Sequence, residues 1–137
     1  MTPAELAALH AAAFTTPRPW SEAEFASLLS DPHCFLVTQA GAFALGRVIA
    51  DEAELLTIAT PPSLRRRGLG RACLTGFDTA ARARNARQAF LEVAANNAAA
   101  IALYLGNGWT ISGKRPGYYR APDGSRVDAQ ILGKPLA

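Results

Sequence analysis

The spacing of apolar residues divides the chain into helical and extended segments in a regular order. Two capping-box sequences, at Thr2 and at Ser21, begin segments whose apolar residues recur every three or four positions. β-Branched and aromatic residues dominate the extended segments, which glycine, proline and asparagine separate. The sequence predicts helices at 3–14 and 21–29, strands at 34–39, 42–50 and 54–60, a helix at 70–84, a strand at 88–94, a short helix at 98–105, and strands at 118–121 and 126–132.

This order of elements predicts an α/β layered fold with a mixed sheet. The 137 residues match the size of one domain and contain no internal repeat or linker, so we expect a single domain over residues 1–137. Half of the residues are hydrophobic and 18% are charged, which is typical of globular proteins. The chain starts without a basic targeting segment and has no apolar run of roughly 18 residues, so we expect a cytoplasmic protein without membrane contact.

Cysteine and histidine are too few and too scattered to suggest a disulfide framework or a metal centre. Cys34 and Cys73 lie far apart and belong to no CxxC motif, so we expect buried, reduced thiols. Neither His10 nor His33 has a partner at metal-ligand spacing. We therefore expect no metal and no Ser-His-Asp or Cys-His catalytic arrangement.

A turn rich in glycine and arginine lies between the third predicted strand and the next helix. Its sequence is Arg65-Arg66-Arg67-Gly68-Leu69-Gly70-Arg71. The N–H groups and dipole at a helix start attract phosphate, and glycine lets a ligand approach the backbone, so the turn predicts a polyphosphate site. Direct nucleic-acid binding is a weaker interpretation, because aromatic residues are not interleaved with the arginines. A solvated helix face better explains three later arginines: Arg82, Arg84 and Arg87.

Glu92 interrupts a predicted strand that is otherwise apolar on both faces, a pattern typical of a central strand. A buried carboxylate is costly unless it is paired, hydrated or protonated, and burial can make it a useful base near neutral pH. A salt bridge to one of the arginines explains Glu92 equally well.

Asn97 and Tyr104 are seven positions apart on the short predicted helix. Residues at this spacing differ by roughly 20° around a helix and share one face. Tyr104 taken alone is best explained as a core aromatic residue with its hydroxyl at the surface. An amide at the helix start and a phenol two turns later could, however, reach the same cleft as Glu92.

Taken in order, these motifs resemble the GNAT superfamily of N-acetyltransferases. The arginine-glycine turn fits the acetyl-CoA signature Q/R-x-x-G-x-G/A. Over nearly the whole chain, the motifs resemble more narrowly the bacterial ribosomal-protein-alanine N-acetyltransferase (RimI-like) family. Further motifs that carry this resemblance are the run from Leu55 to Thr60, Leu91-Glu92-Val93, the segment from Asn97 to Tyr104, Gly108-Trp109, and the segment from Tyr118-Tyr119 to Asp128.

The resemblance implies a three-layer α-β-α (α+β) domain with a mixed, mainly antiparallel sheet, and acetyl-CoA as cosubstrate. It implies Glu92 as general base and Tyr104 as general acid, with direct attack of an amine on the thioester in a ternary complex. The cofactor-binding residues that it implies are Ile58, Ala59 and Thr60 for the pantetheine arm, Arg66, Arg67, Gly68, Leu69, Gly70 and Arg71 for the pyrophosphate, and Asn97 for the pantetheine end.

The acceptor implied by the resemblance is a protein N-terminus, such as an N-terminal alanine of a ribosomal protein. Trp20, Tyr118 and Tyr119 are candidates for lining its site, although core packing explains each of them equally well. A lysine side chain, a small amine, and a coenzyme A binding module without turnover remain alternatives. The presence of both Glu92 and Tyr104 argues against the last of these.

The chain departs from the family at its start. Members usually begin with a strand before the first helix, whereas this chain begins with the helix cap at Thr2. We therefore expect the usual first strand to be missing, with consequences for the sheet edge and for acceptor choice rather than for cofactor binding.

Overall fold

The structure, a computed structural model, describes residues 1–14, 18–64 and 68–137. Helices and strands follow one another in the predicted order, and most begin and end within two residues of their expected positions. The elements are α1 (Pro3–Ala13), α2 (Glu22–Ser30), β1 (Cys34–Gln39), β2 (Ala42–Ile49), β3 (Glu52–Ala59), the short 3-10 helix η1 (Pro62–Leu64), α3 (Leu69–Ala83), β4 (Gln88–Ala94), α4 (Ala98–Leu105), β5 (Thr110–Arg120) and β6 (Arg126–Pro135).

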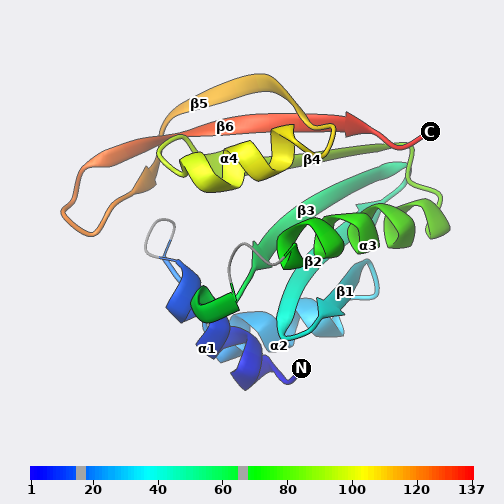
Figure 1. Ribbon diagram of the computed structural model, residues 1–137, viewed down its shortest axis with the longest axis horizontal. Helices are drawn as coiled ribbons and strands as arrows, with labels where there is room; N and C mark the ends of the chain where they lie inside the picture. Colours follow the sequence, from blue (N-terminus) through cyan, green and yellow to red (C-terminus); the bar gives the residue numbers. More distant parts are fainter. Residues whose placement is uncertain (15–17, 65–67) are drawn as a thin grey trace.

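Six strands form one sheet in the order β1-β2-β3-β4-β6-β5. The β3–β4 pair is parallel and the other neighbouring pairs are antiparallel. Helices α1 and α2 pack on one face of the β1–β3 half, and α3 packs on the other face (Figure 1). The predicted three-layer fold with a mixed, mainly antiparallel sheet is therefore confirmed. In the part of the chain that the structure describes, α1 is the first element.

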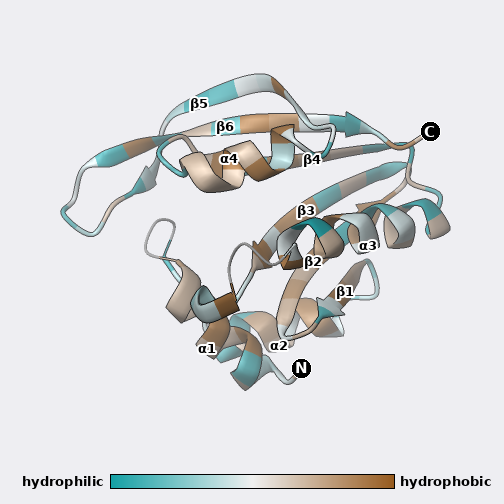
Figure 2. Ribbon diagram, viewed as in Figure 1, coloured by the Kyte–Doolittle hydropathy of each residue, from teal (hydrophilic) through white to brown (hydrophobic). Residues whose placement is uncertain are grey.

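Alternating side chains of β2 supply both halves of the core. Ala44 packs with Phe77 of α3, while Phe43 and Leu45 pack with Phe25 of α2. Figure 2 shows that α3 has hydrophobic and hydrophilic stripes, whereas α4 is hydrophobic along most of its length. An amphipathic helix suits a surface layer, while a largely apolar one needs a further apolar surface or a ligand beside it.

β5 is longer than predicted, and this part of the sequence-based expectation is wrong. The glycine-rich segment after Ser112 was expected to lie outside the strands, yet β5 continues through it to Arg120. Its register with β6 shifts beside Gly113 and again between Arg115 and Tyr119. β5 is an edge strand and needs backbone partners on only one side, so it tolerates bulges and Pro116.

A bulge in β3 reverses the face that its side chains occupy. Leu45 of β2 pairs with Thr57, but the next residue, Gly46, pairs with Leu55, so β3 has one extra residue at Leu56. One extra residue inverts the alternation of a strand. Leu55 accordingly packs in the core under α3, whereas Thr57 reaches α1 on the opposite face.

β3 and β4 pair only along their first three residues, 52–54 with 88–90. Beyond that point β3 runs toward α1 while β4 stays beside β6, so the two strands diverge (Figure 1). The divergence leaves the facing edges of both strands open to a ligand in the middle of the sheet.

Candidate active site

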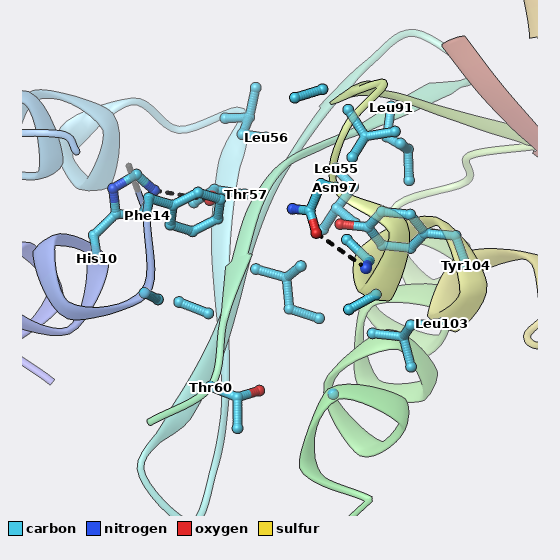
Figure 3. A pocket seen from close by; sticks show the side chains of 18 of the residues that line it. His10, Phe14, Leu55, Leu56, Thr57, Thr60, Leu91, Asn97, Leu103 and Tyr104 are labelled. Carbon is cyan, nitrogen blue, oxygen red and sulfur yellow. Dashed lines mark hydrogen bonds between the residues drawn. The ribbon is translucent and has the colours of Figure 1, made fainter. Parts of the chain in front are cut away.

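A cavity of about 940 Å³ occupies the opening between β3 and β4 (Figure 3). One end is formed by the start of α3 and by α4, and the other by α1 and the segment before α2. Every candidate site residue within the described residues lines it: Trp20, Ile58, Ala59, Thr60, Gly68, Leu69, Gly70, Arg71, Glu92, Asn97, Tyr104, Tyr118 and Tyr119. The two remaining candidates, Arg66 and Arg67, lie outside the described residues.

Glycine is required at two positions at the start of α3 for different structural reasons. Gly68 is the N-cap residue with φ of +75°, a left-handed conformation that favours glycine, and it makes no side-chain capping hydrogen bond. A Cβ atom on Gly70 would lie 2.9 Å from Cδ2 of Leu103, so glycine there allows α3 and α4 to pack closely. Among the described residues, no side chain thus caps the first N–H groups of α3, which lie at the α3–α4 end of the cavity.

Two later arginines of α3 play no part in this end of the cavity. Arg82 Nε donates to the Leu136 carbonyl at 2.9 Å, and Arg84 donates to the Pro32 carbonyl at 3.1 Å. Arg82 lies in the last turn of this 15-residue helix and Arg84 is its C-cap residue, about 20 Å from Gly68. Their exposed guanidinium groups fasten the C-terminal end of α3 to the rest of the fold.

Glu92 lies on β4 with its side chain 18% exposed, and its Oε1 is 3.0 Å from Nε of Arg115 on β5. β4 is a central strand of the sheet, as predicted, but Phe90 and Glu92 are only partly buried where β3 turns away. The salt-bridge interpretation is therefore confirmed, and the carboxylate also lines the cavity, whereas its role as a base stays a prediction. Arg115 is half exposed, so the pair contributes only about 1 kcal/mol or less to stability.

Asn97 caps α4 with its side chain, since Oδ1 accepts the Ala100 N–H at 3.2 Å. The predicted shared face of Asn97 and Tyr104 is confirmed, and Figure 3 shows the tyrosine hydroxyl directed toward the asparagine amide. The capping bond occupies Oδ1, so Nδ2 is the group with which Asn97 can donate to a ligand.

Tyr104 is buried, with 6% of its surface exposed, and packs against Trp109 at a ring distance of 6.1 Å. Burial raises the pKa of its phenol above the ordinary value, with a smaller contribution from Tyr119. The hydroxyl therefore carries its proton throughout the physiological pH range. The backbone carbonyl of Tyr104 accepts N–H groups from Asn107 and Trp109, which fixes the end of α4.

Tyr118 and Tyr119 both line the cavity although they are neighbours in a strand. The bulge in β5 breaks the alternation, and Asp128 Oδ1 holds it by accepting the Gly117 N–H at 2.8 Å. The two rings meet edge to face at 5.0 Å. The Glu92 carboxylate raises the pKa of Tyr118, and burial, followed by Glu92, raises the pKa of Tyr119 to about 12. Both phenols are thus neutral beside the carboxylate.

The expectations from the sequence did not include His10 and Thr57, which also line the cavity. His10 lies four positions after the buried Leu6, on the inner face of α1. That spacing was visible in the sequence, but the bulge that turns Thr57 toward α1 was not.

Comparisons with known proteins agree with this geometry. Residues 4–109 match the acetyltransferase (GNAT) family. The chain is 43% identical over 123 residues to an Escherichia coli K12 protein named [ribosomal protein bS18]-alanine N-acetyltransferase, covering 87% of this chain and 82% of the relative. It is 37% identical over 135 residues to the N-alpha-acetyltransferase RimI of Mycobacterium tuberculosis, covering 92% and 82%.

This chain belongs to the GNAT acetyltransferase family. The crystal structure of the Escherichia coli ribosomal-protein-S18-alanine N-acetyltransferase superposes with a TM-score of 0.85 at 38% identity, covering 98% of this chain and 88% of that one. Ard1 from Thermoplasma volcanium superposes with a TM-score of 0.81 at 25% identity, covering 100% and 95%. The predicted family and the predicted N-acetyltransferase class are confirmed.

Membership of the GNAT family implies acetyl-CoA as the acetyl donor, and the cavity of this acetyltransferase fits that molecule. The uncapped start of α3 offers N–H groups to a pyrophosphate. The open edge of β3 beyond Glu54 offers backbone groups to an extended pantetheine chain. Four apolar residues of α4 complete that wall: Ala99, Ala100, Ala102 and Leu103.

The cysteines of the acetyltransferase are buried free thiols, as expected, and neither lines the cavity. Burial raises the pKa of Cys73 to about 11, so its thiol stays protonated. In the described segments, no helix has the length and apolar character that a membrane span requires.

Proposed function

We propose that residues 1–137 form one acetyltransferase domain that transfers an acetyl group from acetyl-CoA to the α-amino group of a protein N-terminus. The N-terminal alanine of ribosomal protein bS18 is the favoured acceptor, because the Escherichia coli relative is named for that reaction. One observation carries the proposal: Glu92, Asn97, Tyr104 and the uncapped start of α3 line a single cavity. An acceptor of this kind would place the reaction in the cytoplasm.

The cofactor would lie along β3 with its pyrophosphate at the start of α3. Backbone groups of residues 58–60 would hold the pantetheine arm, and Nδ2 of Asn97 would donate to one of its carbonyl oxygens. Residues 68–71 would bind the pyrophosphate together with the preceding Arg66 and Arg67. Acetyl-CoA supplies an activated acetyl thioester, and the protein holds it still while the acceptor amine approaches.

Glu92 would act as the general base. An α-ammonium group must lose a proton before its nitrogen can attack the thioester carbonyl, and Glu92 Oε2 or a water beside it can accept that proton. Arg115 and the neutral Tyr118 border the carboxylate and keep it oriented toward the cavity.

Tyr104 would act as the general acid. Its raised pKa keeps the phenol protonated, so its O–H can donate a hydrogen bond to the thioester sulfur as the C–S bond weakens. The proton then passes to the departing thiolate, the acetyl group stays on the acceptor nitrogen, and the second proton that this nitrogen loses returns through solvent to the Tyr104 phenolate. The buried cysteines take no part in this direct transfer.

The acceptor would enter between Trp20 and the pair Tyr118–Tyr119, all of which line the cavity. Acetylation of a lysine side chain or a small amine is the alternative activity, and a coenzyme A binding module without turnover is the alternative class. The relatives named for N-terminal acetylation favour transfer to a protein N-terminus over both alternatives.

Intact-mass spectrometry of a peptide panel tests the proposed function. The panel pairs a peptide with N-terminal alanine with the same peptide carrying a blocked N-terminus and an internal lysine. We expect one acetyl group on the free α-amine and none on the blocked peptide. Acetylation confined to the internal lysine would overturn the N-terminal proposal, and cofactor binding without any product would favour the binding module.

A further inference from the structure

His10, Trp20 and Thr57 form a hydrogen-bonded chain at the α1 end of the cavity (Figure 3 shows the His10–Thr57 part). The Trp20 N–H donates to His10 Nδ1 at 2.9 Å, and His10 Nε2 lies 3.0 Å from Thr57 Oγ1. His10 is 1% exposed and Thr57 is 8% exposed, yet all three residues line the cavity. The chain links α1, the segment before α2, and the bulged part of β3.

The hydrogen bonds define the state of the imidazole. A backbone N–H can only donate, so Nδ1 of His10 must be the acceptor, and Nε2 carries the hydrogen that it donates to Thr57. Burial lowers the pKa of His10 to about 4, and the nearby Glu24 opposes that shift only weakly. At neutral pH the ring is therefore an uncharged Nε2–H tautomer.

Packing alone does not account for a histidine at this position. The ring stacks on Phe14 at 4.3 Å and on Trp20 at 5.1 Å, and meets Phe25 edge-on at 5.5 Å. Phenylalanine would satisfy these aromatic contacts without burying two polar nitrogens. What the histidine adds is a pair of directed bonds to two residues of the cavity wall.

Resting on the proposed function, we propose that His10 is a positioning residue for the acceptor peptide. The α3–α4 end of the cavity holds the anion site, Asn97 and Tyr104, which leaves the α1 end for the acceptor. His10 fixes the Trp20 backbone on one side and the Thr57 hydroxyl on the other, so it sets the shape of that end. Through Trp20 it acts on acceptor binding, without touching the reacting atoms.

Steady-state kinetics with an N-terminal alanine peptide test this role. His10→Phe keeps the aromatic packing and removes both hydrogen bonds. We expect the KM for the peptide to rise about tenfold, since the Trp20 N–H and the Thr57 hydroxyl both lose their partner. The kcat should change by less than about threefold, and calorimetry should give an unchanged Kd for acetyl-CoA, because the α3–α4 end is intact.

Two partial replacements and one neighbouring variant separate positioning from folding. His10→Asn places a polar atom near the position of Nδ1 and can still accept the Trp20 N–H. His10→Gln places one near Nε2 and can still donate to Thr57. Each should restore part of the peptide KM, and Thr57→Val, which leaves His10 in place, should match His10→Asn. If the role of His10 were purely structural, the peptide KM of the variants would instead follow their thermal stability.

The outcomes distinguish this inference from the proposed function. A wild-type protein that forms no N-terminal product overturns the proposed function and the inference with it. An active wild type with an unchanged peptide KM in both His10→Phe and Thr57→Val overturns the inference alone. Equal losses of peptide and acetyl-CoA binding would also overturn it, because they would indicate a general structural effect.

Discussion

The two ends of the cavity are built in different ways. At the α3–α4 end each group is placed by its own helix: Gly68 begins α3, Asn97 caps α4, and Tyr104 lies two turns further along α4. At the α1 end, His10 bonds to Trp20, which is 10 positions away in the sequence, and to Thr57, which is 47 positions away and faces α1 because of a strand bulge. At the α3–α4 end, the chemical groups are positioned by interactions between residues close in sequence. At the α1 end, the cavity wall depends on contacts between distant residues that form only in the folded chain.

Among the proposed variants, loss of the base Glu92 should lower the catalytic rate most. We expect Glu92→Gln to lower kcat/KM about 1000-fold at neutral pH, and much less at high pH, where the acceptor amine is already deprotonated. A pH–rate profile with saturating acetyl-CoA measures this. An equal loss at every pH would show that Glu92 serves structure, through Arg115, rather than proton transfer.

Loss of the acid should come next. Tyr104→Phe is expected to lower kcat about 300-fold, because the departing thiolate then has no proton donor. The ring still packs against Trp109, so the Kd for acetyl-CoA should change less than about threefold. Rapid-quench kinetics and calorimetry together provide the check, and an unchanged kcat would remove Tyr104 from the chemistry.

The success of the sequence-based predictions follows the same division. Helix starts were predicted because the capping residues at Thr2, Ser21 and Asn97 act on N–H groups within three positions. Strand β5 was predicted too short because Gly113 and Pro116 normally end strands, and only the sheet order shows that β5 is an edge.

Residues whose partners are distant were harder to interpret. The Glu92–Arg115 pair depends on the register of β5 across β6, which the sequence does not encode in any local signal. His10 gave only the spacing of an inner helix face, because its partner Thr57 faces α1 only through the bulge at Leu56. Long-range pairing and bulges thus mark where prediction from the sequence ended.

The α1 end should also respond to pH in its stability. The pKa of His10 is lowered from an ordinary 6.5 to about 4, so the unfolded chain binds a proton first as the pH falls. The contribution of His10 to folding stability is therefore constant above about pH 6.5 and is lost progressively between pH 6.5 and 4, by at most about 3 kcal/mol.

Urea unfolding of the wild type and of His10→Phe at pH 7 and pH 4 measures this term. Other groups titrate equally in both proteins, so the stability of the wild type relative to the variant should fall as the pH falls. Parallel stability curves would contradict a neutral buried imidazole and would weaken the contrast between the two ends.

The smallest effect concerns the turn at the start of α3, where two matched glycines separate strain from binding. Gly68 has φ of +75° and Gly124, in the turn between β5 and β6, has φ of +87°, and an added Cβ would meet nothing within 4 Å at either. Alanine at either position should therefore cost about 1 kcal/mol of stability through backbone strain alone. Only Gly68→Ala should also weaken acetyl-CoA binding, by about fivefold in calorimetry, because only Gly68 lines the cavity. If both variants bind acetyl-CoA as the wild type does, the conformation of Gly68 serves the fold rather than the pyrophosphate. The short-range features at this end of the cavity would then determine where α3 begins without determining how the ligand binds.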